Sequence, residues 1–128
     1  MIDLEKIIPV LHIVDEDKAR AFYLEKLGFE LDFAWRHEPG FPIYMGIKKG
    51  ELYLHLSEHG KEHNTAELYV FVDNLEEWHE RCLSNGVDLE SGPQKMPWGN
   101  TDMLILDPFR NSLRISQMNT HKPTHESA

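Results

Sequence analysis

The strongest constraint on the fold is a pattern that occurs twice in the chain. The dipeptide Val-Asp at 14–15 recurs at 72–73, and the glycine-led segment 28–31 recurs at 86–89, shifted by the same number of residues. Each copy reads as a strand ending in Val-Asp, a helix of about three turns, a glycine stop and a new strand. A fixed repeat of this size indicates two equivalent supersecondary units. A cleft between such units is a natural place for a ligand.

The apolar periodicity predicts the same element order, β-α-β-β-β, in both halves of the chain. We expect first-half strands at 7–14, 29–35, 43–48 and 51–57, and second-half strands at 67–72, 87–90, 103–106 and 112–117. Asp15 and Asn74 can cap the two helices, whose inward faces carry Ala19, Phe22, Tyr23 and Leu27 in the first and Leu75, Trp78, His79 and Cys82 in the second. Residues 91–100 read as a long loop, and 107–111 as a turn.

These elements predict an α+β protein built as a single domain over residues 1–118. Its two modules cover about 7–57 and 66–117, with a polar linker at 58–65. A chain of 128 residues buries roughly two-thirds of its unfolded surface, which is enough for a core without disulfides. The polar tail at 119–128 is predicted to be flexible.

Composition limits the function classes. The N-terminus lacks a basic segment followed by an apolar run, and no apolar stretch approaches the ~20 residues of a membrane span, so we expect neither a signal peptide nor a membrane helix. A single cysteine, Cys82, fits a reducing cytoplasm. The net charge of −9 disfavours nucleic acid, whose phosphates attract Lys and Arg, and it favours capture of a cationic ligand. An acidic composition that serves only solubility is the alternative.

Short motifs spread over residues 7–117 are similar to those of a known superfamily. They are Pro-Val-Leu at 9–11 followed by Asp15, Phe-Tyr at 22–23, Leu-Gly-Phe at 27–29, Leu-His-Leu-Ser at 54–57, Pro-Trp-Gly at 97–99, and Asp-Pro at 107–108 followed by Asn111. With the duplicated modules, they resemble the vicinal oxygen chelate superfamily, which includes glyoxalase I, extradiol dioxygenases, fosfomycin-resistance transferases and bleomycin-resistance proteins. The resemblance is closest to the bleomycin-resistance proteins, because the Pro-Trp-Gly motif is the more discriminating one. It implies a glyoxalase-like fold in which the modules form a curved mixed sheet, and a homodimer with ligand grooves at the subunit boundary.

The resemblance also implies where a catalytic metal ion would bind, and this chain lacks most of those ligands. Enzymes of the superfamily hold a divalent ion with about three or four His and Glu ligands on inward-facing strand positions. Matched by motif, the first position is Ile8, which cannot coordinate, and the last is Arg114, whose fixed positive charge would repel a cation. At most His55 and Glu67 remain, because the matching position of the second module falls on either Glu67 or Ala66. We therefore predict a protein without metal or other cofactor, and a binding protein rather than an enzyme.

Other reactive groups receive weaker support. If His12 on the first strand joined His55 and Glu67, a relocated metal site would make the chain a metal-dependent lyase, dioxygenase or thiol transferase, and this alternative stays open. Further metal-capable side chains lie close together in the linker, where neighbouring glycine and asparagine favour a loop: Glu58, His59, Glu62 and His63. Cys82 lies on the helix stripe and is interpreted as a core residue rather than a nucleophile.

The remaining aromatic and acidic residues predict a ligand groove. In the proteins that this chain resembles, aromatic side chains stack on the flat heteroaromatic part of the drug. The equivalent groove positions here are Phe33, Trp35, Phe41, His55, Tyr69, Trp98 and Gly99, with Asp32, Glu38 and Asp102 as the carboxylates beside them. The alternative for each aromatic side chain is packing at the surface or at an interface.

The energetics of such a groove call for both stacking and charge. Burying about 150–250 Å² of flat apolar surface yields about 4–6 kcal/mol, whereas micromolar affinity needs about 8 kcal/mol. Carboxylates that face a cationic tail can supply part of the difference. The predicted function is therefore sequestration, without chemical change, of a cationic aromatic antibiotic of the bleomycin type, a glycopeptide-like small molecule.

Overall fold

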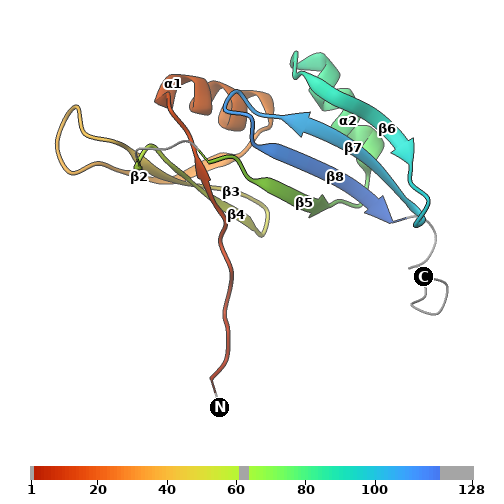
Figure 1. The fold of residues 1–128 in the computed structure, drawn as a ribbon, viewed down its shortest axis with the longest axis horizontal. Coiled ribbons are helices and arrows are strands. Elements are labelled where there is room, and N and C mark those ends of the chain that lie inside the picture. Colours follow the sequence, from red (N-terminus) through yellow and green to blue (C-terminus); the bar gives the residue numbers. More distant parts are fainter. Residues whose placement is uncertain (1, 61–63, 119–128) are drawn as a thin grey trace. The chain divides into compact units, whose positions relative to one another are not determined.

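The computed structural model describes residues 2–60 and 64–118, and its strands fall into two compact units that divide between Asn64 and Thr65 (Figure 1). Each unit contains one four-stranded sheet and its own helical segment. The α+β class and the two tandem β-α-β-β-β modules are thus confirmed. The predicted tail at 119–128 lies outside the described residues.

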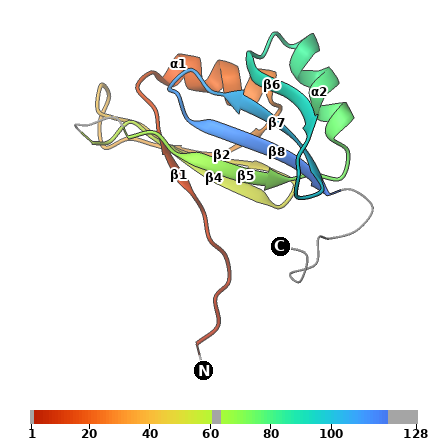
Figure 2. The same ribbon diagram turned by 45° about the vertical axis from the view of Figure 1, so that its right-hand side comes forward.

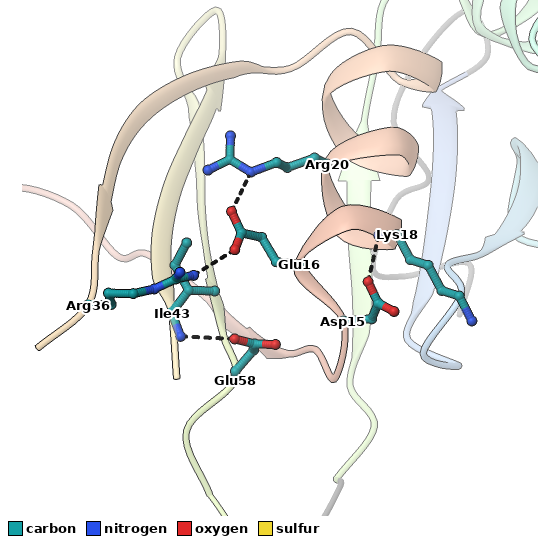
Figure 3. Close-up of polar contacts among 7 residues, drawn as sticks. All are labelled: Asp15, Glu16, Lys18, Arg20, Arg36, Ile43 and Glu58. Carbon is teal, nitrogen blue, oxygen red and sulfur yellow. Dashed lines mark hydrogen bonds and ion pairs between the residues drawn. The ribbon is translucent and has the colours of Figure 1, made fainter. Parts of the chain in front are cut away.

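The first unit consists of β1 (Val10–His12), α1 (Glu16–Ala19), η1 (Arg20–Lys26), β2 (Glu30–Trp35), β3 (Tyr44–Lys49) and β4 (Leu52–Ser57). Its sheet has the order β1-β4-β3-β2, in which β1 runs parallel to β4 and the other neighbours are antiparallel. The carboxylate of Asp15 accepts a hydrogen bond of 3.0 Å from the Lys18 amide and caps α1 as predicted (Figure 3).

The predicted first helix forms, but most of it is a π-helix. In η1, the amide of Leu27 donates to the carbonyl of Phe22 at 2.9 Å, the i→i+5 pattern of that helix type. The wider turn accommodates two adjacent large rings, Phe22 and Tyr23, which are both buried and meet edge to face at 4.9 Å. Gly28, with φ of 80°, lies directly after the helical segment as expected.

The second unit consists of β5 (Glu67–Phe71), α2 (Leu75–Ser84), β6 (Leu89–Lys95), β7 (Asn100–Leu106) and β8 (Ser112–Met118). Its sheet has the order β5-β8-β7-β6, with β5 parallel to β8. The side chain of Asn74 caps α2 by accepting from the Glu77 amide at 3.2 Å. Figure 2 shows α2 lying along one face of this sheet, where Leu75 and Cys82 are buried. None of the helices in the described part of the chain is long and apolar enough to cross a membrane.

Two predicted segments are wrong in extent. The segment 91–100 is not one long loop, because β6 continues to Lys95 through Pro93 and only residues 96–99 separate it from β7. This is possible because β6 is an edge strand, where proline's missing N–H need not pair, and two register shifts interrupt its pairing with β7. The first strand is shorter than predicted: β1 is only Val10–His12, and Ile7, before Pro9, is largely exposed.

A buried turn at 107–111 joins three strands of the second unit. The Asp107 carboxylate accepts three hydrogen bonds of 2.8 Å, from the Phe109 amide and from the backbone and side-chain amides of Asn111. The side-chain oxygen of Asn111 in turn accepts from the Ala66 amide at 2.9 Å, just before β5. The predicted turn is therefore confirmed, and it ties the β7–β8 connection to the start of the parallel strand.

Candidate functional site

One face of the first sheet carries a row of aromatic side chains, which we call the aromatic face: Phe33, Trp35, Tyr44 and His55. Strand register places them together, since Trp35 pairs with Tyr44 and Phe33 pairs with Gly46, which pairs with His55. The Phe33 and Tyr44 rings are nearly parallel at 6.3 Å, and each meets the His55 ring at 5.2 Å. A hydrogen bond of 2.8 Å joins the Tyr44 hydroxyl to His55 Nδ1.

Glycine at position 46 makes room for this arrangement. A Cβ atom there would lie 2.6 Å from Cδ1 and 2.9 Å from Cζ of Phe33, far inside ordinary contact distance. The Phe33 ring therefore lies over the bare backbone of the neighbouring strand. This places a flat ring against the sheet while leaving its outer surface available.

The loop between β2 and β3 extends the aromatic face. His37 lies 6.3 Å from the Trp35 ring and 5.4 Å from the Phe41 ring, so these side chains continue from the strand end into the loop. Phe33, Trp35 and Phe41 are 40, 55 and 47% exposed, respectively. Clusters of exposed aromatic side chains are more typical of binding sites than of ordinary protein surface.

Carboxylates fix both ends of that loop (Figure 3). At its start, Arg36 Nη2 donates to Glu16 Oε1 at 2.6 Å, and the second oxygen of Glu16 accepts from Arg20 Nε at 2.8 Å. At its end, the Ile43 amide donates to Glu58 Oε1 at 3.0 Å. The hydrogen bond from Arg36 is the main cause that lowers the pKa of the Glu16 carboxyl, against the raising effect of partial burial.

The predicted acids of the first unit are in or near this region. Asp32 lies on β2 and forms an ion pair of 3.8 Å with Lys48, in which both side chains are well exposed. Glu38 is exposed in the loop, and its backbone carbonyl accepts from the Phe41 amide at 3.0 Å. A hollow of about 380 Å³ in the same unit is bounded on one side by Phe41 and on others by His12 and Glu58.

In the second unit, the rings of Tyr69 and Phe71 stack at 5.2 Å on one face of β5, as their shared face predicts. The Tyr69 hydroxyl donates to Asp102 Oδ2 at 2.9 Å, and the Ser116 hydroxyl donates to Asp102 Oδ1 at 2.6 Å. Arg114 Nη1 lies 3.6 Å from the same carboxylate. Asp102, which was predicted as a carboxylate beside the groove, is only 1% exposed, and the positive charge of Arg114 balances its negative charge inside the unit.

Trp98 and Gly99 occupy the short loop between β6 and β7. The Gly99 amide donates to the Met96 carbonyl at 3.0 Å, and the Met96 amide donates to the Asn100 carbonyl at 2.7 Å, which makes a tight turn. Gly99 has φ of 103°, a conformation that favours glycine and lets the chain make this turn beside Trp98. The Trp98 side chain is 49% exposed.

The residues at the family's metal positions do not fit a metal ion. Arg114 Nε lies 3.6 Å from Glu67 Oε1, so a guanidinium already occupies the position beside this carboxylate. His12 and His55 lie on adjacent strands, with Val10 paired to His55 and His12 paired to Ser57. Among residues 2–60 and 64–118, no group of three or more His, Cys, Asp or Glu side chains is arranged to hold a metal ion.

The other reactive candidates have structural surroundings of their own. Glu58 holds the Ile43 amide, and the backbone amide of exposed His59 donates to the Ser57 hydroxyl at 3.1 Å. Their linker neighbours Glu62 and His63 lie outside the described residues. Cys82 is fully buried, and this burial raises the pKa of its thiol, as expected for a core residue.

Sequence reasoning missed Tyr44, Glu16 and Arg36. Tyr44 had a signal, because its position opposite the end of the preceding strand follows once the β2–β3 hairpin is drawn. The Glu16–Arg36 pair had none, because the two residues are far apart in the chain and only the folded unit brings them together.

Comparisons with known proteins show the family and the fold of the chain. The model of the family described as glyoxalase superfamily protein matches residues 1–121. A bleomycin resistance protein of Klebsiella pneumoniae is 30% identical over 119 residues, which cover 85% of this chain and 89% of that protein. A solved structure of a bleomycin-binding protein complexed with bleomycin is 28% identical with a TM-score of 0.71, over 91% of this chain and 100% of that one. TioX from Micromonospora sp. ML1 shares the fold, with a TM-score of 0.76 at 18% identity over 90% of this chain and 99% of that one. The chain described here belongs to the glyoxalase superfamily.

Proposed function

We propose that this protein binds and sequesters a cationic, aromatic antibiotic of the bleomycin type without altering it. The observation that carries the proposal is the exposed aromatic face, in which Phe33 and Trp35 continue into Phe41. Flat rings held on a sheet offer a stacking surface at low entropic cost, because the strand already fixes their positions. The relationship to a bleomycin resistance protein supports the same ligand class.

Charge complements stacking in this proposal. The chain carries a net charge of −9, which raises the local concentration of a cationic ligand and speeds its capture. Asp32 and Glu38 lie on or just beyond the strand that carries Phe33 and Trp35, so their carboxylates are the first candidates to meet a cationic tail. Trp98, Gly99, Tyr69 and His55 complete the proposed ligand-binding set, whereas Asp102 acts through its hydrogen bond to Tyr69.

We include in the proposal a cytoplasmic homodimer that uses no metal for binding. The support for the last point is the guanidinium of Arg114 beside Glu67, because a fixed cation at 3.6 Å from this carboxylate opposes a second cation there. To sequester a ligand, the protein has only to bind it tightly and catalyses no reaction. A surface of aromatic rings and carboxylates is suited to binding a cationic aromatic ligand.

Calorimetric titration with bleomycin, in the presence and absence of a chelator, tests the proposal. We expect saturable binding, one ligand site per chain at most, and the same affinity with and without chelator. Replacing Trp35 or Trp98 by Phe should weaken binding, whereas Trp78→Phe on α2 is the matched control and should leave it unchanged. Absence of heat at high micromolar bleomycin would reject the ligand.

A divalent-metal-dependent lyase, dioxygenase or thiol transferase is the second candidate. One observation favours it: His12 and His55 lie on adjacent parallel strands, two register positions apart and on the same face of the sheet. Metal analysis of the purified protein discriminates between the two candidates. One tightly held divalent ion per chain, lost in His55→Ala, would favour the second candidate over the first.

A further inference from the structure

The loop at 36–43 is long for a hairpin connection and lacks regular secondary structure. It nevertheless carries His37 and Phe41, which extend the aromatic face beyond Trp35. Within the loop, the Phe41 amide donates a hydrogen bond of 3.0 Å to the Glu38 carbonyl and closes a turn. Gly40, with φ of 87°, lies inside this turn. What holds such a loop in place therefore decides whether its rings present a fixed surface.

The start of the loop is held by Glu16 at the first position of α1. One carboxylate oxygen accepts from Arg36 Nη2 at 2.6 Å and the other accepts from Arg20 Nε at 2.8 Å (Figure 3). The side chains of Glu16 and Arg36 are 27 and 32% exposed, so solvent screens this pair only in part. Arg36 follows Trp35 directly in the chain, so the ion pair fixes the strand end that carries the indole.

The end of the loop is held independently. Glu58 accepts from the Ile43 amide and its own amide donates to the Ile43 carbonyl, both at 3.0 Å. With this second anchor intact, loss of the first frees only one end of the loop. The unit itself then has no reason to unfold, because its core residues take no part in the Glu16 contacts.

We propose that Glu16 is a positioning residue for ligand binding, which holds Arg36 and thereby sets the places of Trp35, His37 and Phe41 without touching the ligand. This inference rests on the proposed function. A carboxylate between two guanidinium groups is a strong clamp, because its removal leaves Arg20 and Arg36 facing each other as like charges. A loop that is fixed before the ligand arrives loses less entropy on binding.

The test compares Glu16→Gln with Glu25→Gln in the full chain. Both variants remove one negative charge, but Glu25 lies exposed near the end of η1, nine residues after Glu16. For Glu16→Gln we expect bleomycin affinity to fall by about three- to tenfold, which corresponds to the ordering of one or two side chains. The loss should appear as faster dissociation, whereas the charge control should show at most a slower association.

Two further measurements separate positioning from a general structural defect. In the ligand-free protein, amide exchange at the four non-proline residues of 37–42, which are His37, Glu38, Gly40 and Phe41, should accelerate in Glu16→Gln and not in Glu25→Gln. In an Arg36→Gln background, adding Glu16→Gln should weaken binding no further, because the clamp is already lost. The inference would be overturned if Glu16→Gln and Glu25→Gln had equal bleomycin affinities and equal amide exchange rates. It would also be overturned if Glu16→Gln weakened binding as much in the Arg36→Gln background as in the wild-type protein. If the wild-type protein fails to bind bleomycin, the proposed function falls, and the exchange comparison alone decides whether Glu16 holds the loop.

Discussion

Replacing Gly46 by Ala should disturb the first unit through a single side chain, Phe33. The new methyl group would lie 2.6 Å from Cδ1 and 2.9 Å from Cζ of that ring, about 1 Å closer than carbon atoms normally approach. The ring is already 40% exposed, so it can move outward into solvent rather than force the backbone apart. The substitution thus acts as a specific way of displacing Phe33 from the aromatic face.

The expected change in unfolding free energy follows from the area involved. If three-fifths of about 200 Å² of Phe surface is covered, complete expulsion costs about 3 kcal/mol at ~25 cal/mol/Å². Exchanging a strand glycine for alanine returns about 0.5–1 kcal/mol. Because the ring is expected to keep part of its contacts, we predict a net loss of about 1–2 kcal/mol, measured by urea denaturation.

The control is the same substitution in a Phe33→Ala background. Without the ring the methyl group meets no obstacle, so Gly46→Ala should there be neutral or stabilising by up to about 1 kcal/mol. The change of sign between the two backgrounds is the diagnostic result, since a double-mutant cycle isolates the interaction of the two sites. Equal destabilisation in both backgrounds would show that Gly46 is required for another reason and would refute this account of the aromatic face.

Three further predictions concern other parts of the molecule. Asp107→Ala should destabilise the second unit by about 3 kcal/mol in chemical denaturation, because the buried N–H donors of Phe109 and Asn111 lose their acceptor. A loss of less than ~1 kcal/mol would contradict the proposed role of the turn. Cys82 should resist a thiol reagent in the native protein and react only after unfolding, because burial raises its pKa; immediate stoichiometric labelling would refute this. The Glu16 carboxyl has a folded pKa below its ordinary value of 4.5. Its contribution to the free energy of unfolding is therefore present above pH 4.5 and is lost as the pH falls through the folded pKa. In an acid titration of stability, Glu16→Gln should lack this pH-dependent contribution.

Local sequence signals predicted most of the fold. Asp15 and Asn74 cap helices because their short polar side chains reach the next turn, and such contacts depend only on neighbours in the chain. The loop predicted at 91–100 was wrong in extent because β6 continues through Pro93, and a strand tolerates proline there only because β6 lies at an edge. Whether a strand lies at an edge depends on sheet order, which no local pattern contains.

The candidate site was less predictable for the same reason. Trp35 and Phe41 were predicted as groove residues because aromatic residues beside a loop stand out in the sequence. The burial of Asp102 was not predicted, because its partners, Tyr69, Ser116 and Arg114, come from two other strands and converge only through the register of the sheet. The electrostatic role of a carboxylate depends on such partners, so it becomes visible only in the folded unit.

The parallel pairing of β1 with β4 bears on how the chain is made. Strand β1 lies at the edge of its sheet, beside β4, so the N-terminal strand finds its hydrogen-bonding neighbour only after residues 52–57 have been synthesised. From then on, every strand of the first sheet has been synthesised, while β5 to β8 are still to come. Assembly during synthesis can therefore proceed one module at a time, and β1 stays unpaired for the shortest time when translation from β1 to β4 is fast.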